Sequence, residues 1–244
     1  MKIAVVGKGG SGKTTTSAVL ARTLAQSGWA TLALDCDSNP NLGISLGIGE
    51  EATERLVSVR DAVDAGEEEH ATSADDLVER FGVDAPDGVR LAVVSAIQNP
   101  KPGCPCCGIS PEQLLAELER PDRLVIADLE AGLGTIMRLE KGSVDVVVVV
   151  GEPTMKSREG GRRAAESVFE AGLGRVMVAG NRTRTDEDEA RVRAAFPGLE
   201  PVIVPDDQAI LDAERRGEAP LDAARGAPGV RALVGLANGL LDVG

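Results

Sequence analysis

The chain alternates between short, continuous apolar runs and longer segments in which apolar positions recur at helical spacing. The apolar runs are Ile3–Val6, Thr31–Leu34, Val89–Val94, Leu124–Ala127, Val144–Val150, Val176–Ala179 and Pro201–Val204. Continuous apolar runs of this length are typical of strands in a parallel sheet that is covered on both faces. Helical patterns cover residues 14–27, 111–120, 156–172, 186–195, 207–216 and 229–241. This alternation predicts an α/β fold with a mostly parallel, doubly wound sheet flanked by helices.

Residues 50–88 depart from this alternation. The segment is acidic, contains Glu67-Glu68-Glu69 and has weak periodicity. We expect helical excursions and loop there, with the charges on a solvated face. Because no internal repeat or linker divides the chain, residues 1–244 are predicted to form a single domain that contains this excursion.

A glycine-rich segment, Gly7–Thr14, joins the first apolar run to the first helical pattern. Its glycines let backbone N–H groups turn around phosphate oxygens, and the helix N-terminus adds a partial positive charge. The motif predicts that Lys13 contacts the β- and γ-phosphates of ATP or ADP and that the Thr14 hydroxyl binds Mg²⁺. The remaining predicted phosphate-binding residues are Gly9, Gly10, Ser11, Gly12 and Thr15.

Acidic residues follow two of the apolar runs, at the sheet edge where the phosphates would lie. Asp35 and Asp37 follow Thr31–Leu34, and Asp128 follows Leu124–Ala127. A carboxylate there can orient an attacking water or hold Mg²⁺, because phosphoryl transfer depends on positioning and charge neutralisation. Asp128 is the predicted Mg²⁺ ligand at a strand end. Taken alone, the segment after Asp35 also fits an Asx turn that closes a strand.

Two later strand ends offer side chains for the base of a nucleotide. Asn181 and Arg182 follow one apolar run, and Pro205 and Asp206 follow the next. The Asn181 amide can donate to and accept from an adenine edge, while Pro205 would line the base and Asp206 its rim. A plain turn after each strand explains these residues nearly as well.

Three of the four cysteines, Cys104, Cys106 and Cys107, cluster between Gly103 and Gly108, and the fourth is Cys36. Zinc prefers four ligands, so the cluster of one chain cannot complete a tetrahedral site. Two chains related by a twofold axis would supply four thiolates from Cys104 and Cys106, a set that suits Zn²⁺ or Ni²⁺. A redox dithiol and plain loop cysteines remain alternatives. The pattern gives no role to Cys107 or Cys36.

The net charge and the hydropathy of the chain argue against two classes of binding partner. The chain has 39 acidic and 26 basic residues and a net charge of −13, which argues against a nucleic-acid-binding surface. No apolar segment is long enough to span a bilayer, and the start of the chain leaves no room for a signal peptide before the first strand. Reduced thiols kept for chemistry fit the cytosol. We therefore expect a cytoplasmic protein that binds neither membrane nor nucleic acid.

The phosphate loop contains a second lysine, Lys8, which makes its sequence resemble the motif of one particular group of proteins. Residues 8–15 read Lys-Gly-Gly-Ser-Gly-Lys-Thr-Thr, which resembles the deviant Walker A motif of the MinD, ParA, nitrogenase iron protein and CooC group of SIMIBI-type P-loop NTPases. The resemblance implies an ATPase that forms an ATP-linked homodimer in which Lys8 reaches the partner's nucleotide. It also implies that Asp37 positions the attacking water, that Asp35 assists near Mg²⁺, and that the pairs at 181–182 and 205–206 flank adenine.

Within that group the chain resembles the CooC-type nickel-insertion ATPases of carbon monoxide dehydrogenase maturation. The resemblance rests on Gly-Cys-Pro-Cys at 103–106, Asp-Leu-Glu-Ala-Gly at 128–132, Arg138 and the Glu-Pro pair at 152–153. It implies a metallochaperone that holds nickel at Cys104 and Cys106 of two subunits and delivers it to a client metalloenzyme. The family usually has a Glu-His pair where this chain has Gly134 and Thr135, so the identity of the client stays open.

Two other functions within the group are less consistent with the residues. A MinD-like or ParA-like positioning ATPase needs a basic amphipathic C-terminal helix or a basic face. Residues 229–242 hold one basic residue, Arg231, and the compact basic cluster is limited to Arg158, Arg162 and Arg163. A redox ATPase like the nitrogenase iron protein needs a cysteine shortly after Asp128, and none follows it.

Overall fold

A sheet of eight strands forms the centre of the computed structural model, which describes residues 1–65, 73–94, 110–118 and 122–241. The strand order is β3-β4-β2-β5-β1-β6-β7-β8. The strands are β1 (Lys2–Gly7), β2 (Ala30–Cys36), β3 (Val83–Asp84), β4 (Val89–Val93), β5 (Arg123–Leu129), β6 (Val146–Gly151), β7 (Arg175–Thr183) and β8 (Val202–Pro205). All neighbours pair in parallel except β3 and β4 at one edge. The predicted fold class is confirmed.

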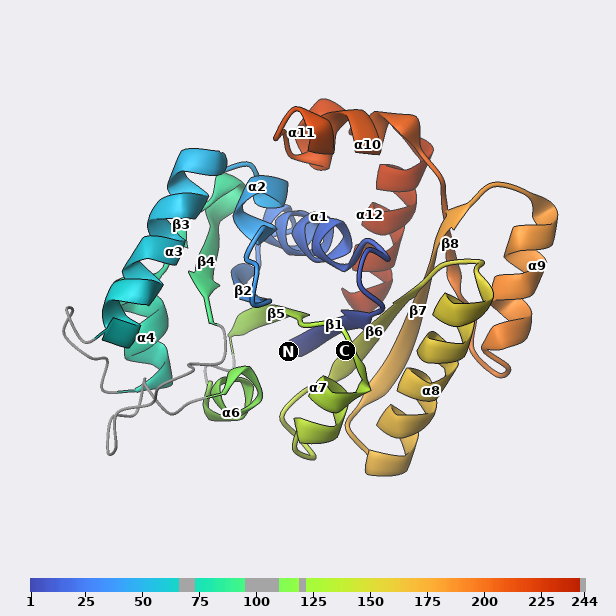
Figure 1. The fold of residues 1–244 in the computed structure, drawn as a ribbon, viewed down its shortest axis with the longest axis horizontal. Helices are drawn as coiled ribbons and strands as arrows, with labels where there is room; N and C mark the ends of the chain where they lie inside the picture. Colours follow the sequence, from blue (N-terminus) through green and yellow to red (C-terminus); the bar gives the residue numbers. More distant parts are fainter. Residues whose placement is uncertain (66–72, 95–109, 119–121, 242–244) are drawn as a thin grey trace.

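Helices cover both faces of this sheet (Figure 1). One face carries α1 (Lys13–Gln26), α2 (Leu42–Leu46) and α12 (Pro228–Leu241), with α10 (Gln208–Arg215) and α11 (Pro220–Ala223) on the same side. The other face carries α6 (Pro111–Glu117), α7 (Leu133–Arg138), α8 (Met155–Ala171) and α9 (Asp186–Ala195). Near the edge of β3 and β4 lie α3 (Glu50–Ala65), α4 (Ala74–Phe81) and the 3₁₀ turn η1 (Pro86–Gly88). None of the helices described is both long and apolar enough to cross a membrane.

Alternate residues of each central strand face two separate aliphatic cores. In β1, Ile3 and Val5 pack with α1 and α12, whereas Ala4 and Val6 pack on the side of α8. All four side chains are at most 1% exposed. A strand buried on both faces has no position for a polar residue, which explains why a continuous apolar run marked it in the sequence.

The described part of the acidic excursion contains the expected helical segments as α3 and α4, together with β3 and η1. The Ser73 side chain caps α4 by accepting from the Asp76 N–H. The observed elements differ from the expected ones mainly where an element is short. The helices α2, α7 and α11 have 5, 6 and 4 residues, which is too short to show a helical period. The helix expected over 111–120 ends at Glu117. Strand β7 continues to Thr183, so Asn181 and Arg182 lie inside this strand and not after it.

Candidate functional site

The glycine-rich loop connects the end of β1 to the start of α1 at the carboxyl edge of the sheet. Gly12, the residue before α1, has a left-handed backbone with φ of 95° and ψ of 23°. A Cβ atom on Gly12 would lie 2.3 Å from Asn181 Nδ2, so a larger residue cannot be accommodated without movement. No side chain caps α1. The N–H groups of its first turn therefore remain available to an anion.

The two lysines of the loop have different environments. Lys13 is 6% exposed, and its charge favours the ionised form of Asp128. Lys8 is exposed, and its ammonium makes no hydrogen bond or ion pair to any described residue. The Ser11 hydroxyl is buried and also lacks a partner among the described residues. An unpartnered buried hydroxyl beside open N–H groups fits a phosphate oxygen as the missing partner.

Two buried carboxylates lie beside this loop. Asp35 of β2 and Asp128 of β5 are opposite each other in the parallel pair and are 1% and 2% exposed. Burial raises the pKa of Asp35 to about 7, with a further contribution to this rise from the charge of Asp128 and against the hydrogen bond from the Leu42 N–H, which lowers it. Burial likewise raises the pKa of Asp128 to about 6, although hydrogen bonds and Lys13 oppose the shift. Adjacent buried carboxylates with raised pKa values favour a bound cation.

The partners of Asp128 bring the predicted Mg²⁺ ligands together. The Thr14 side chain lowers the pKa of Asp128, and the Ser17 hydroxyl lies 3.1 Å from Asp128 Oδ1 and 2.9 Å from the Lys13 carbonyl oxygen. The side-chain atoms that could bind Mg²⁺ here are all oxygens, which Mg²⁺ prefers as ligands. Within the described residues no group of three or more His, Cys, Asp and Glu side chains could hold a metal. A bound Mg²⁺ would therefore need phosphate oxygens or water as further ligands.

Asp37 lies in the loop after β2 and is half-buried. Its Oδ1 accepts from the Asn39 N–H over 3.0 Å, so the Asx turn considered from the sequence does form. The neighbouring Ser38 hydroxyl lies 3.3 Å from Glu130 Oε1 in the loop after β5. The two loops that follow the acidic strands are thus in direct contact. The structure leaves the assignment of Asp37 to the attacking water as a prediction.

A pocket opens beside the phosphate loop, between α1, α10 and the ends of β7 and β8. The four residues expected near the base all line it, namely Asn181, Arg182, Pro205 and Asp206. Gly12 and Thr15 form its side nearest the loop, and Ile210 contributes apolar surface from α10. A nucleotide with its phosphates on the loop would have this pocket within reach of its base.

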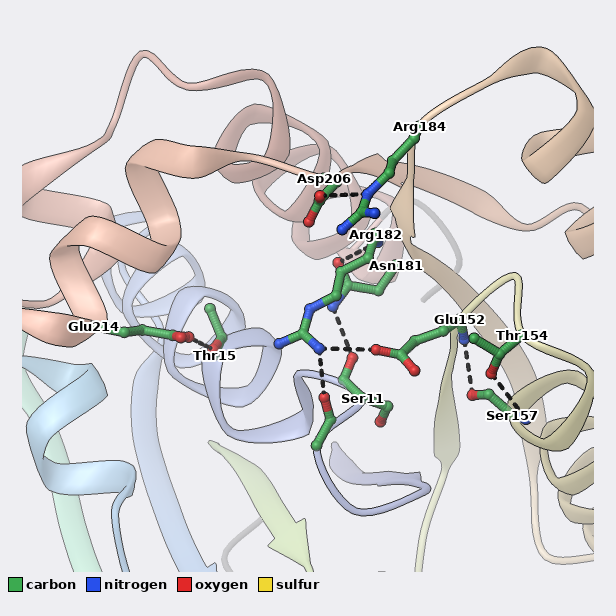
Figure 2. Close-up of polar contacts among 11 residues, drawn as sticks. Ser11, Thr15, Glu152, Thr154, Ser157, Asn181, Arg182, Arg184, Asp206 and Glu214 are labelled. Atoms are coloured by element: carbon green, nitrogen blue, oxygen red, sulfur yellow. Dashed lines mark hydrogen bonds and ion pairs between the residues drawn. The ribbon is translucent and has the colours of Figure 1, made fainter.

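Asn181 and Arg182 also hold the loop itself (Figure 2). Asn181 Nδ2 donates to the Ser11 carbonyl oxygen over 2.7 Å. Arg182 lies at an irregularity in the pairing of β7 with β8 and has φ of 57°, a left-handed backbone. Its guanidinium donates to the Gly10 carbonyl oxygen and to Glu152 Oε1, each over 2.9 Å. These bonds brace the loop, a role that the sequence did not predict.

Three other residues of the site were not identified from the sequence. Ser17 lies one helical turn after Lys13, and this spacing could have suggested it. Glu152 directly follows β6, as the other polar candidates follow their strands. Glu214 accepts a hydrogen bond from Thr15 but belongs to α10, and no local pattern in the sequence indicates it.

Cys104, Cys106 and Cys107 lie outside the described residues, so the predicted Zn²⁺ or Ni²⁺ site stays a prediction. Cys36 is a free thiol at the buried end of β2, and burial raises its pKa well above the usual range.

Comparison with known proteins places this site within a family. Residues 2–221 match the family model described as the CobQ/CobB/MinD/ParA nucleotide binding domain. The carbon monoxide dehydrogenase accessory protein CooC of Rhodospirillum rubrum is 32% identical over 175 residues, which is 64% of this chain and 65% of CooC. An uncharacterized ATP-binding protein of Methanocaldococcus jannaschii is 30% identical over 236 residues, covering 89% of this chain and 90% of that protein.

Solved structures show the same fold at lower sequence identity. The cell division ATPase MinD of Pyrococcus furiosus superposes with a TM-score of 0.70 at 22% identity and covers 100% of this chain and 99% of its own. MinD of Pyrococcus horikoshii, solved in complex with Mg-ADP, gives 0.69 at 18% identity and covers 98% and 95%. Since the family model matches most of the sequence, the chain belongs to the CobQ/CobB/MinD/ParA family of nucleotide-binding, P-loop ATPase domains.

Proposed function

We propose that the protein is a Mg²⁺-dependent ATPase that carries nickel and delivers it to a metalloenzyme such as carbon monoxide dehydrogenase. The observation that carries the proposal is the 32% identity to the carbon monoxide dehydrogenase accessory protein CooC, combined with the Cys104–Cys106 pair. Two thiolates from each of two subunits form a four-sulfur site that suits Ni²⁺ or Zn²⁺. Binding and release of this metal cargo would follow the nucleotide state of the dimer.

The chemistry of ATP hydrolysis is assigned to the loop and the acidic strand ends. The N–H groups of residues 9–14 and the Ser11 hydroxyl hold phosphate oxygens, and the Lys13 ammonium offsets their charge. Thr14, Asp35 and Asp128 would hold Mg²⁺, which neutralises phosphate charge when bound. Asp37 orients the attacking water from the loop after β2. Asn181, Arg182, Pro205 and Asp206 surround the adenine.

Lys8 supports an ATP-linked homodimer. Its side chain is exposed beside the phosphate loop and has no partner in the described part of its own chain. An ammonium in that place can reach the nucleotide of a second subunit that packs against the loop. ATP would then join the two subunits and bring their cysteine pairs together, and hydrolysis would separate them.

A positioning ATPase of the MinD or ParA kind is the competing function, and the fold is shared with it. Two observations favour the metallochaperone. The apolar face of α12 is packed against the sheet, with Leu233 and Leu236 at most 2% exposed, so it is not free for a membrane. In the basic cluster on α8, Arg162 and Arg163 both pair with Glu159, which lowers the positive charge available to DNA.

Metal titration of the reduced protein tests the proposal. With ATP and Mg²⁺ present, we expect one Ni²⁺ or Zn²⁺ per two chains, with weaker binding at low pH because thiolates become protonated. Changing Cys104 and Cys106 together to serine should abolish this binding and leave nucleotide binding intact. Cys107→Ser is the matched control and should bind metal normally. One metal per chain, or undiminished binding in the double variant, would refute the interface site.

A further inference from the structure

A hydrogen bond joins α10 to the phosphate-loop helix α1 (Figure 2). Thr15 Oγ1 donates to Glu214 Oε1 over 2.6 Å. Thr15 is 8% exposed, and both residues line the pocket that holds Asn181 and Pro205. The position of Glu214 brings a carboxylate into a pocket whose expected ligand is itself an anion.

This hydrogen bond is the main polar contact between the last turn of α10 and the rest of the protein. Gln208 and Arg215 both bond to Asp212 within the same helix. Among the described residues, Thr15–Glu214 is the one side-chain hydrogen bond from the body of α10 to another helix. The first turn is fixed separately, because Asp207, the N-cap, accepts from the Gly229 N–H of α12 over 3.1 Å. Loss of the Thr15 bond would therefore loosen the Glu214 end, where the buried Ala213 still packs, and leave the other end anchored.

Thr15 lies between the phosphate loop and the part of the pocket lined by Asn181 and Pro205. A nucleotide with its phosphates on the loop and its base in that part would have its sugar and nearest phosphate close to Thr15 and Glu214. The Thr15 hydroxyl has one hydrogen, so it cannot donate to Glu214 and to a phosphate oxygen at the same time. The carboxylate and the phosphate also repel each other because both are negative.

We propose that Glu214 competes with the nucleotide for the Thr15 hydroxyl, so that nucleotide binding breaks the Thr15–Glu214 bond and releases the end of α10. Glu214 thereby weakens nucleotide binding and couples the site to a surface helix. This inference rests on the nucleotide site proposed above. The charge responsible for this effect belongs to Glu214 of α10, a helix that lies outside the phosphate loop and outside its sequence motif.

Calorimetric titration of MgADP into the wild-type protein and three variants tests the affinity. Glu214→Gln keeps the size of the side chain and removes its charge, and Glu214→Ala removes the acceptor as well. We expect both to bind MgADP more tightly, by about tenfold for Glu214→Ala, because the competing hydrogen bond to a charged group is lost. Asp212→Asn removes a carboxylate from the same helix outside the pocket and should bind as wild type does.

Hydrogen exchange of the α10 amides tests the coupling. MgADP should speed exchange in the last turn of α10 in the wild-type protein, and Glu214→Ala should exchange fast without nucleotide. Weaker binding by either Glu214 variant would overturn the inference, since Glu214 would then be a ligand contact, for example to the sugar hydroxyls. Unchanged α10 exchange on binding would overturn it too. Wild-type protein that binds no MgADP would instead refute the nucleotide site on which it rests.

Discussion

Replacing Asp35 by asparagine should stabilise the nucleotide-free protein at pH 8. Asp35 is 1% exposed beside Asp128, and burial raises its pKa from 3.8 to about 7. In the unfolded chain this carboxyl loses its proton near pH 3.8, whereas the folded protein keeps the proton until about pH 7. The folded state therefore binds more protons between these values, so its stability falls as the pH rises through this window.

The pKa values set the size of the effect. A rise from 3.8 to about 7 corresponds to a loss of roughly 4 kcal/mol of folding free energy once Asp35 is ionised. Asp35 and Asp128 are both negative when ionised and repel each other, so part of this loss belongs to the pair. The figure is therefore an upper bound for the substitution of Asp35 alone. We expect Asp35→Asn to recover about half of it, roughly 2 kcal/mol, which raises the Tm of a chain of this length by roughly 4–8 °C.

Thermal unfolding at pH 5 and pH 8, without nucleotide or Mg²⁺, measures this effect. The Tm of Asp35→Asn should exceed that of wild type at pH 8 and match it at pH 5, where Asp35 is already neutral. Asp37→Asn removes a neighbouring charge that also raises the pKa of Asp35, so it should produce a smaller gain in Tm at pH 8. If Asp35→Asn destabilises the protein equally at both pH values, Asp35 matters as the acceptor of the Leu42 N–H, and the burial argument is wrong.

The other predictions concern the phosphate loop and its neighbours. Lys13→Ala should weaken ATP binding by at least about tenfold in calorimetry, because it removes a charged group that donates to the phosphates. Asp37→Asn should bind ATP normally and hydrolyse it slowly. An equal loss of ATP binding in both variants would contradict the role of Asp37. Lys8→Ala should hydrolyse ATP poorly and sediment as a monomer with a non-hydrolysable analogue, and a normal dimer would make Lys8 a plain surface residue. Gly12→Ala should lose nucleotide binding, because its Cβ would lie 2.3 Å from Asn181 Nδ2; unchanged affinity would show that the loop can shift freely.

The seven apolar runs all correspond to strands. The central strands are buried on both faces and so have few polar positions in these runs, whereas β8 at the sheet edge is only partly buried. The sequence also predicted which strand ends carry polar groups, since Asp35 and Asp128 directly follow apolar runs. In a parallel sheet those ends meet at one edge, so residues far apart in the chain could be expected at a common site.

The contacts between these strand ends could not be predicted in the same way. Strands β2 and β5 are neighbours in the sheet but not in the chain, so nothing local indicated that Asp35 and Asp128 lie opposite each other. The irregularity in β7 carries Asn181 and Arg182 back toward the loop, and it depends on pairing with β8. Glu214 reaches Thr15 only because α10 packs beside α1.

The left-handed backbone of Arg182 and the hydrogen bonds of its side chain favour different residues at position 182. Its φ of 57° costs roughly 1–2 kcal/mol relative to glycine, and asparagine tolerates such a conformation better than arginine does. Glycine or asparagine would relieve this cost but would leave the Gly10 carbonyl and Glu152 without their guanidinium donor. Directed evolution for heat resistance and directed evolution for nucleotide turnover should therefore select different residues at position 182.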